Sequence, residues 1–246
     1  MERKGIPKSI LLRVMLRSFL LQASWNFERL QNLGTLYVLK PALSFLYRDD
    51  EFKQACLRHL EHFNTHPFLA SPIFGTLLAL ENEPASRFDV QEFKSMIAAP
   101  YAAMGDSFFW GGVRPLAACL ALFFAFKGSL AEVAVFLVLF NIPHLWFRTV
   151  GFWQGYSLGI DSVAKIQEQR LPDQALRLKE LTVILLGGLC AYLTFLTLQA
   201  KSLAAGWGIL VLPLVFVVGW LARRRISVLL LALSMAAVVL AIPQIA

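Results

Sequence analysis

The chain has 246 residues, of which 57% are hydrophobic and only 16% are charged, and its mean hydropathy is +0.60. Soluble globular domains usually carry about 25% charged residues, so this composition excludes an ordinary soluble domain and indicates an integral membrane protein. The net charge is +7. In a chain this apolar, an excess of Lys and Arg is expected in the cytoplasmic segments. A nucleic-acid-binding surface is disfavoured, because no basic run is interleaved with exposed aromatic residues.

The first predicted element is a helix over residues 8–31. At about 100° per residue, Arg13 and Arg17 fall on one narrow stripe of the first half, which suits an amphipathic helix lying in the lipid headgroup layer. The second half carries polar residues on two faces beside Trp25 and Phe27. Such a helix should contact two different polar surroundings.

Apolar stretches in the middle of the chain are short or interrupted. Residues 68–80 form a stretch of about thirteen residues, the tract 96–126 is cut at Gly105–Ser107, and residues 130–147 contain Pro143. At membrane depth such stretches suggest re-entrant hairpins and discontinuous helices, from which transporters build substrate sites. For residues 68–80, a buried hairpin in a soluble helical domain is the alternative interpretation.

The C-terminal third contains three charge-free spans, over residues 181–200, 202–222 and 226–246, each about long enough to cross a bilayer. Residues 223–225 are three arginines, and the positive-inside rule places them in the cytoplasm. The same choice places the basic segment 161–180 in the cytoplasm and the C-terminus outside.

Four short stretches concentrate polar side chains that could carry chemistry: WNFERLQN (25–32), HLEHFNTHP (59–67), GDSFFWGGVRP (105–115) and FNIPHLWFR (140–148). No P-loop, GxGxxG, GxSxG or HExxH signature is present, so the chain is expected to have no catalytic residues and no cofactor. The three cysteines stand alone in the sequence, which excludes a disulfide framework and a zinc spacing.

Three histidines in the second stretch raise the question of a metal site. His59, His62 and His66 are three and four residues apart and would share one side of a continuous helix. Asn64 and Thr65, followed by proline, indicate instead that the helix stops there. We therefore favour a polar turn, in which Asn64 or Thr65 caps the following helix, and expect no metal.

Asp106 lies in the strongly apolar third stretch. A carboxylate at membrane depth is costly unless it has a partner or faces a wet cavity, so a functional role is the first interpretation. The structural alternative is that Asp106 or Ser107 caps a helix beginning at Phe108, with Arg114 as counter-ion. Both can hold, because a helix N-terminus in a broken hairpin is itself a polar binding feature.

From about Leu16 to Gly159, these stretches together resemble the IID membrane component of the mannose/fructose/sorbose-family sugar phosphotransferase system. The matching motifs are long and specific: LRSFLLQASWNFERLQNLG, RHLEHFNTHPFLASPIFGTLLALE, GDSFFWGGVRP and LFNIPHLWFRTVGFWQGYSLG. The expected fold is an all-α integral membrane protein with an amphipathic N-terminal helix, re-entrant or broken helical hairpins and about three C-terminal transmembrane helices. Its expected parts are the N-terminal helix and signature segment (1–34), the hairpin core (35–160), a cytoplasmic connection (161–180) and the C-terminal helices (181–246).

The resemblance implies a multi-pass subunit of a sugar permease in the bacterial inner membrane. Family members pair with a IIC membrane subunit in a translocation unit thought to work as an elevator, and the IIC–IID pairs are expected to form homo-oligomers. Cytoplasmic IIA and IIB proteins carry phosphate on histidine, and IIB phosphorylates the hexose as it arrives. The IID chain itself is not thought to be phosphorylated, which agrees with the missing catalytic signatures.

The resemblance also suggests which side chains line or support the sugar path. The polar candidates are Asn26, Glu28, Gln31, Asn64, His66 and Asp106, and Trp25 or Trp110 could stack on a sugar face. Sugar hydroxyl groups need such partners, since each one buried without a partner costs about 1–3 kcal/mol. The alternative for each residue is a polar contact between subunits or hairpins.

A second function remains open at this point, a membrane receptor or regulatory subunit that keeps the scaffold without transporting sugar. Some relatives of the family serve as docking sites for bacteriocins or phage. Sugar-dependent phosphorylation that requires both IIC and this chain would separate the two functions.

Overall fold

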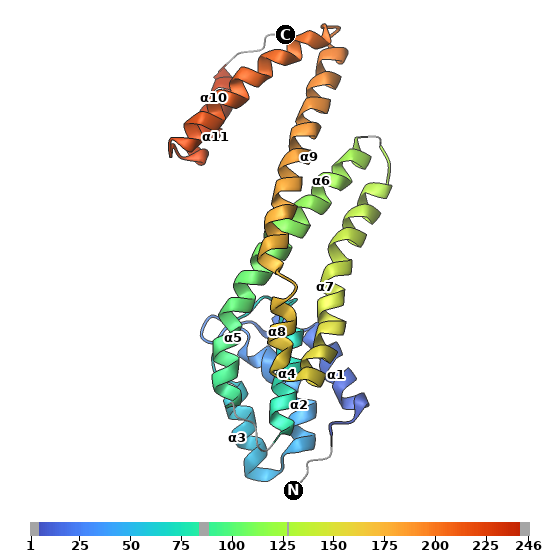
Figure 1. Ribbon diagram of the computed structural model, residues 1–246, viewed down its shortest axis with the longest axis vertical. Coiled ribbons are helices and arrows are strands. Elements are labelled where there is room, and N and C mark those ends of the chain that lie inside the picture. Colours follow the sequence, from blue (N-terminus) through green and yellow to red (C-terminus); the bar gives the residue numbers. More distant parts are fainter. Residues whose placement is uncertain (1–4, 84–88, 127, 242–246) are drawn as a thin grey trace. The chain divides into compact units, whose positions relative to one another are not determined.

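The computed structural model describes residues 5–83, 89–126 and 128–241, and Figure 1 shows their helices in chain order. Within these ranges the chain contains helices and two isolated β-bridges but no strand. The helices are α1 (Lys8–Ser18), η1 (Leu21–Ser24), α2 (Asn32–Leu46), α3 (Asp49–His59), α4 (Ala70–Asn82), α5 (Val90–Gly105), η2 (Asp106–Val113), α6 (Arg114–Ala125), α7 (Ala131–Leu158), α8 (Asp161–Gln167), α9 (Leu171–Ala200), η3 (Ala205–Leu210), α10 (Val211–Arg223) and α11 (Val228–Ala241). The predicted all-α class is confirmed.

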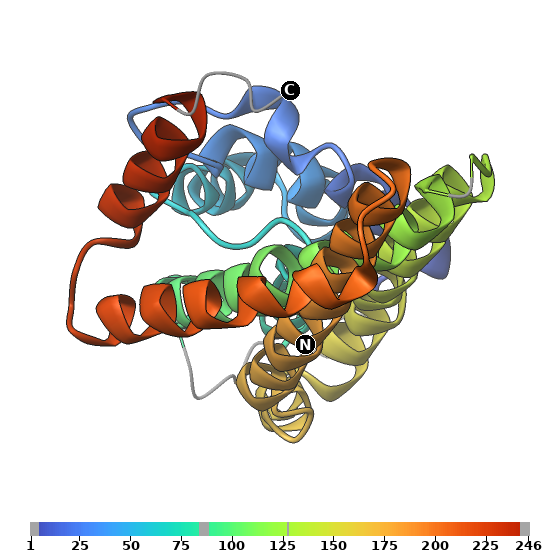
Figure 2. The same ribbon diagram turned by 90° about the horizontal axis from the view of Figure 1, so that it is seen from above.

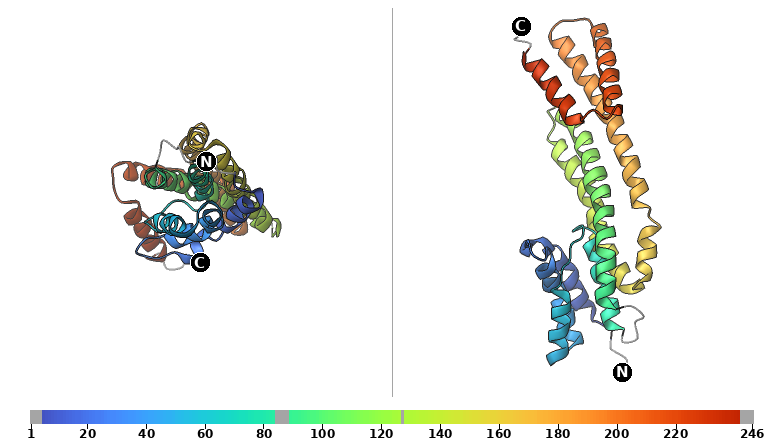
Figure 3. Two further views of the ribbon diagram at one scale, coloured as in Figure 1. Left: turned by 90° about the horizontal axis from the view of Figure 1, so that it is seen from below. Right: turned by 90° about the vertical axis from the view of Figure 1, so that its left-hand side faces the viewer.

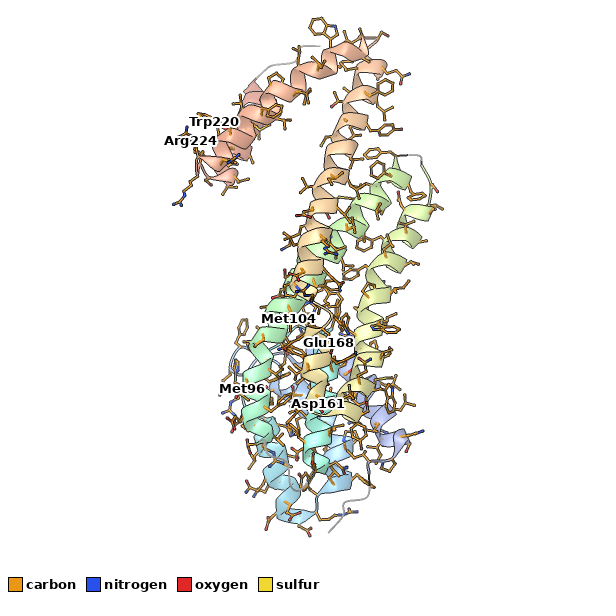
Figure 4. All side chains as sticks on the ribbon, viewed as in Figure 1. Met96, Met104, Asp161, Glu168, Trp220 and Arg224 are labelled. Atoms are coloured by element: carbon orange, nitrogen blue, oxygen red, sulfur yellow. The ribbon has the colours of Figure 1, made fainter. Side chains whose placement is uncertain are left out.

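The chain divides into two compact units, residues 1–185 and 186–246. Among the described residues, four helical segments are long and apolar enough to cross a membrane: Val90–Ala125, Ala131–Leu158, Asp161–Ala200 and Ala205–Arg223. Figure 4 shows the many apolar side chains that project from α6 and α7. The predicted membrane-protein class is therefore confirmed as well.

Helix α4 lies at the centre of the first unit and is buried on nearly every side, as expected of a helix that is apolar all round. It packs on α7 through glycines that let the two backbones approach closely. A Cβ added to Gly75 would lie 2.2 Å from the carbonyl oxygen of Phe152, and one added to Gly155 would lie 2.2 Å from that of Pro72. Small residues serve the same purpose in packed membrane helices generally.

The break predicted at Gly105–Ser107 does not occur. Helices α5, η2 and α6 follow one another directly, and the right-hand view of Figure 3 shows them as a single run. Gly105 and Asp106 both have right-handed helical backbone angles, and η2 is a π-helical segment. The wider turn of a π-helix accommodates the residues Gly105–Ser107, whose sequence predicted a break. π-Helical segments are frequent at functional sites.

Helix α7 likewise runs without a break through Pro143, and it packs side by side with α6 (Figure 2). At the C-terminal end, helices occur at each of the three predicted spans: the second half of α9, η3 with α10, and α11. Helix α11 is described as far as Ala241, so residues 242–246 of the third predicted span lie outside the described residues, as do residues 1–4 of the N-terminal segment.

The continuous helix predicted over residues 8–31 was wrong. Helix α1 ends at Ser18, the 3-10 helix η1 follows, and residues 25–31 form a loop closed by an antiparallel bridge between Asn26 and Leu30. The backbone of Leu30 is left-handed, with φ of 55°. Such a conformation is incompatible with a continuing right-handed helix.

Candidate functional site

The polar residues of the loop 25–31 fasten it to the segment that precedes α4. The Gln31 side chain donates from Nε2 to the carbonyl oxygen of Thr65 at 2.8 Å, and its Oε1 accepts from the Thr65 N–H at 3.0 Å. The Gln31 N–H donates to the carbonyl oxygen of Phe63 at 2.8 Å. Gln31 is buried, and its amide supplies the hydrogen bonds of the Thr65 backbone, which lies just beyond the parallel bridge between Leu30 and Phe63.

Replacing Gln31 by leucine should destabilise the first unit by about 2–3 kcal/mol, because it leaves a buried N–H and a buried carbonyl of Thr65 without partners. Thermal unfolding of the purified, detergent-solubilised protein measures the loss. Gln22→Leu is the matched control, since the Gln22 side chain is exposed. Equal melting temperatures for the two variants would contradict the structural role of Gln31.

A polar cavity with a volume of ≈ 240 Å³ adjoins this loop. Its walls come from η1, the loop 25–31, the segment 64–67, the end of α5 and the π-helical segment η2. The lining residues are Gln22, Gln31, Asn64, Thr65, His66, Pro67, Ala102, Asp106 and Trp110. Five of the eight residues predicted for the sugar path therefore lie around one cavity.

The other three predicted residues lie elsewhere. Asn26 closes its own loop, donating to the side chain of Asn32 at 2.8 Å and accepting from the Arg29 N–H at 2.9 Å. Glu28 has an 82% exposed side chain, and Trp25 is exposed beside Phe27, with ring centroids 4.9 Å apart. Asn26 and Glu28 line a separate open depression of ≈ 560 Å³, and none of the three lines the polar cavity.

The His66 ring is fixed by its surroundings. It stacks on Phe109 at a centroid distance of 5.1 Å and also contacts Phe68 and Trp110 at 5.0 Å. Gly105 makes room for it, since an added Cβ there would lie 2.2 Å from His66 Cγ. The ring is therefore held in one orientation at the wall of the polar cavity.

The protonation of His66 follows from its neighbours. Burial, together with the positive charge of Arg148, lowers the pKa of His66 to about 4, so the ring is neutral at physiological pH. Its Nδ1 accepts a hydrogen bond from the Phe68 N–H at 3.3 Å. A neutral imidazole that accepts at one nitrogen carries its proton on the other, so Nε2–H is a donor.

This donor has no hydrogen-bond partner in the described part of the chain. His66 Nε2 is buried and lies 4.0 Å from Oδ1 of Asp106, which is too far for a hydrogen bond. The Asp106 side chain is 64% exposed. A buried donor thus faces a solvent-accessible carboxylate across a gap.

The capping role considered for Asp106 was wrong, because Asp106 lies inside a continuous helical run and caps no helix. Nor is Arg114 its counter-ion in the described structure: the guanidinium of Arg114 lies over the ring of Trp110, 5.2 Å from its centroid. Asp106 and Trp110 are four residues apart in η2. Because a π-turn holds more than four residues, they fall on nearly the same side and both line the cavity.

The predicted cap of α4 by Asn64 or Thr65 was also wrong. Helix α4 begins at Ala70, its N-cap residue is Leu69, and no side chain caps it. The described residues contain no group of three His, Cys, Asp or Glu side chains that could hold a metal ion. His62 is exposed, and His59 is engaged in a second cluster.

Sequence reasoning missed that cluster, which is centred on the buried carboxylate of Glu81. Glu81 accepts hydrogen bonds from the Tyr47 hydroxyl, from Arg58 at 2.7 to 3.1 Å and from His59 Nε2 at 2.8 Å. Lys94 donates to the carbonyl oxygen of Arg58 at 2.8 Å. None of these residues lines the polar cavity. The available signal was a glutamate that ends the apolar run 68–80.

The electrostatics of this cluster favour an ionised Glu81. Burial alone would raise the pKa of Glu81, but hydrogen bonds from His59 and Tyr47 and the charge of Arg58 lower it to about 2. Burial lowers the pKa of His59, so this ring donates from Nε2 as a neutral imidazole. The cluster therefore contains an ion pair between the buried Glu81 carboxylate and the half-buried Arg58 guanidinium, which joins α3 to α4.

Comparison with known proteins gives a consistent set of relatives. The chain is 44% identical over 167 residues to the mannose-specific EIID component of the phosphotransferase system of Escherichia coli (strain K12), covering 65% of this chain and 59% of that protein. It is 35% identical over 176 residues to the fructose permease IID component of Bacillus subtilis (strain 168), covering 69% and 64%. The match thus spans about six tenths of the length of these curated relatives.

Two solved structures resemble the whole chain. One, described only as a membrane protein, has a TM-score of 0.75 and 33% identity, with 97% of both chains covered. A chain from the cryo-EM structure of the mannose transporter ManYZ with microcin E492 has a TM-score of 0.60 and 32% identity, with 97% and 96% covered. The family model of the mannose/fructose/sorbose family IID component of the phosphotransferase system matches residues 5–245. With nearly its full length matched, this chain belongs to that IID family.

Proposed function

We propose that this chain is a membrane subunit of a sugar permease which, with a IIC partner, translocates a hexose that IIB phosphorylates on arrival. The observation that carries the proposal is the polar cavity, where Gln31, Asn64, His66, Asp106 and Trp110 come together. Its volume of ≈ 240 Å³ lies below the range of about 300–1,000 Å³ for small-molecule pockets. A single sugar ring suits a site of that size.

The lining residues divide into supporting and binding groups. Gln31 already uses its amide on the backbone of Thr65, so it shapes the wall. Asn64, His66 Nε2 and Asp106 Oδ1 make no hydrogen bond to a described residue and remain for sugar hydroxyl groups. Trp110 is half-buried, with the Arg114 guanidinium over its ring and Phe140 stacked on it at a centroid distance of 6.0 Å, so it shapes the wall of the cavity. The IIC subunit supplies the rest of the sugar path.

The chain performs no covalent step in this scheme. Phosphate reaches the sugar through the cytoplasmic IIA and IIB proteins, and IIC–IID pairs associate into homo-oligomers in the inner membrane, with the C-terminus of this chain outside. The apolar side chains exposed along α7 and α10 support a lipid or subunit environment, since a water-exposed surface of that extent is unusual. The exposed side chains of the loop 25–31, Trp25, Phe27 and Glu28, suit contact with the partner subunit.

The proposal is tested in membranes that contain the IIC partner, with IIA, IIB and the general phosphotransfer proteins added. Phosphoenolpyruvate-dependent phosphorylation is measured over mannose, fructose, sorbose and amino sugars, with and without this chain. Activity that requires this chain supports the transport function and identifies the sugar. An intact complex without activity on any sugar would overturn it and favour a receptor or regulatory subunit.

Asp106→Asn should leave the complex assembled and reduce hexose uptake at least ~10-fold, because the amide is a weaker acceptor than a carboxylate for a sugar hydroxyl. Uptake of labelled hexose is measured beside size-exclusion chromatography of the solubilised complex. Asp161→Asn on α8, labelled in Figure 4, is the matched control, since this exposed aspartate lies outside the cavity. Loss of assembly in Asp106→Asn would assign Asp106 a structural role.

A further inference from the structure

Arg148 is a buried cation that has no counter-ion among the described residues. It lies in the membrane-capable helix α7, is 7% exposed, and forms neither an ion pair nor a hydrogen bond with any described residue. Its Nε is buried without a partner. An ionisable side chain at membrane depth is costly and normally has a partner. The described part of this chain thus leaves a buried positive charge to be compensated.

Aromatic rings hold the guanidinium of Arg148 in place. It lies over the ring of Phe19, 4.7 Å from the centroid, and over that of Phe68, 5.1 Å from the centroid. Such contacts are made through the flat face of the guanidinium, so they use none of the five N–H donors on its edge. That edge matches a carboxylate, which accepts two parallel hydrogen bonds. Arg148 is therefore a preorganised receptor for a planar anion.

The groups of the polar cavity do not compensate this charge. Asp106 lies 4.0 Å from His66 Nε2 and forms no ion pair with Arg148 in the described structure. His66 is neutral at physiological pH. The anion for Arg148 is therefore sought outside this chain.

The surface beside Arg148 has the composition of a protein interface. Phe19 and Leu20 at the end of α1 are exposed, and so is Leu145, one turn before Arg148 on α7, where α1 packs against α7. A buried arginine beside exposed apolar side chains is typical of an interface hot spot. Residues 5–27 contain three basic residues and no acidic one. This local positive charge favours an acidic partner.

We propose that Arg148 receives a carboxylate of the partner membrane subunit, an Asp or Glu side chain that meets the guanidinium edge beside Phe19 and Phe68. A lipid phosphate is the other anion that an arginine edge binds. A carboxylate suits this buried edge better, because it is flat and hangs on a single chain, whereas a phosphodiester is tetrahedral and carries two substituents. The inference rests on the proposed function for the existence of a IIC partner, and it names the chemistry of one contact between the subunits.

The first test is zero-length cross-linking in the purified complex of this chain with IIC. Arg148→Lys keeps the positive charge and provides an amine, which a carbodiimide joins to a contacting carboxylate with loss of water. Peptide mass spectrometry should find position 148 joined to an acidic residue of the partner subunit. The wild type, which has no amine at this position, is the control. A cross-link to Asp106, or none in a folded complex, would overturn the proposal.

Removal of the charge is the second test. Arg148→Met leaves the partner's carboxylate buried and unpaired, so co-purification of IIC with this chain should fall at least ~10-fold. Neutralising the cross-linked carboxylate as well should restore co-purification, because removing both members of a buried pair costs far less than removing one. Arg170→Met is the matched control, since the Arg170 side chain is 80% exposed.

The second test also covers a cross-linking variant that does not assemble. If Arg148→Lys gives no complex, each acidic residue in the membrane segments of IIC is neutralised in turn in the Arg148→Met background. Rescue by one of them would support the ion pair, and rescue by none would contradict it.

A lipid phosphate would give a different pattern. The melting temperature of the wild-type complex in nanodiscs would rise with the fraction of phosphatidylglycerol, that of Arg148→Met would not, and no cross-link to protein would form. That result would overturn the proposal. Failure of the proposed function is distinguishable: a complex that phosphorylates no sugar but shows the cross-link and the rescue retains the ion pair, whereas an active complex without them excludes it.

Discussion

Glu81→Gln is expected to destabilise the first unit by about 3 kcal/mol, the lower end of the range for breaking a buried ion pair, because the Arg58 side chain is 30% exposed and water solvates part of it. The Glu81 side chain is 1% exposed and accepts from Arg58, His59 and Tyr47. The neutral amide keeps the shape of glutamate but leaves the guanidinium of Arg58 without its counter-ion. In thermal unfolding of the solubilised protein, this variant should show the largest decrease in melting temperature of any single substitution of a titratable residue in this unit.

Glu61→Gln is the matched control for this substitution. Glu61 is exposed and is contacted by Gln91, and surface substitutions of this kind usually change stability by less than about 0.5 kcal/mol. A Glu81→Gln variant as stable as Glu61→Gln would show that the buried cluster does not hold α3 against α4.

The same cluster predicts a dependence of stability on pH. The pKa of Glu81 falls from 4.5 to about 2 on folding, so the folded state binds fewer protons than the unfolded state in that interval. The stabilisation is present in full above pH 4.5 and is lost as the pH falls toward 2. Melting temperatures measured from pH 6 to pH 3 should fall more steeply for the wild type than for Glu81→Gln.

Gly155→Leu is expected to prevent the packing of α4 on α7 and so to abolish accumulation of folded protein. Its Cβ would lie 2.2 Å from the carbonyl oxygen of Pro72 and 3.0 Å from the Thr76 nitrogen. Both are backbone atoms, which cannot rotate away as a side chain can. Overpacking that side chains can absorb costs about 1–3 kcal/mol, and a clash with backbone exceeds that range. Membrane abundance and size-exclusion profiles measure the effect.

Gly187→Leu provides a matched control on α9, because no atom lies within 4 Å of a Cβ added there. This variant should accumulate like the wild type. Normal abundance of Gly155→Leu, with an unchanged melting temperature, would contradict the close approach of α4 and α7.

The sequence predicted those parts of the fold that depend only on the length of an uninterrupted hydrophobic stretch. Long charge-free stretches cannot remain in water, so the C-terminal spans 181–200 and 202–222 were evident. The side chains around the polar cavity were predicted as a group because polar residues in an apolar chain need partners or water, although their shared position became evident only in three dimensions.

The errors have equally physical origins. Gly105–Ser107 looked like a helix break, but the π-helical segment η2 keeps the backbone helical while shifting its register. Gly111 and Gly112, in the same apolar tract, lie against Lys179 and Leu178 of α9, where an added Cβ would be crowded. A pattern of glycines does not distinguish a break from a close approach between helices.

The loop 25–31 was predicted as a helix because its polar residues have helical spacing. Its actual partners are long-range: Gln31 binds Thr65, and Asn32 donates to the carbonyl oxygen of Leu60 at 2.8 Å. The Glu81 cluster was missed for the same reason, since Tyr47, Arg58 and Glu81 are distant in sequence. Local periodicity contains no information about such contacts.

Protection of the polar cavity by sugar is the most direct test of the central claim that this cavity binds the transported hexose. In a complex whose native cysteines are replaced, Asn64→Cys places a thiol at the exposed cavity wall, and Asp161→Cys places one on α8. The rate of maleimide alkylation is measured with and without saturating mannose, fructose or sorbose. We predict that one of these sugars slows alkylation at position 64 and leaves position 161 unaffected. Equal rates at position 64 with and without every sugar that the complex phosphorylates would contradict the assignment of the cavity.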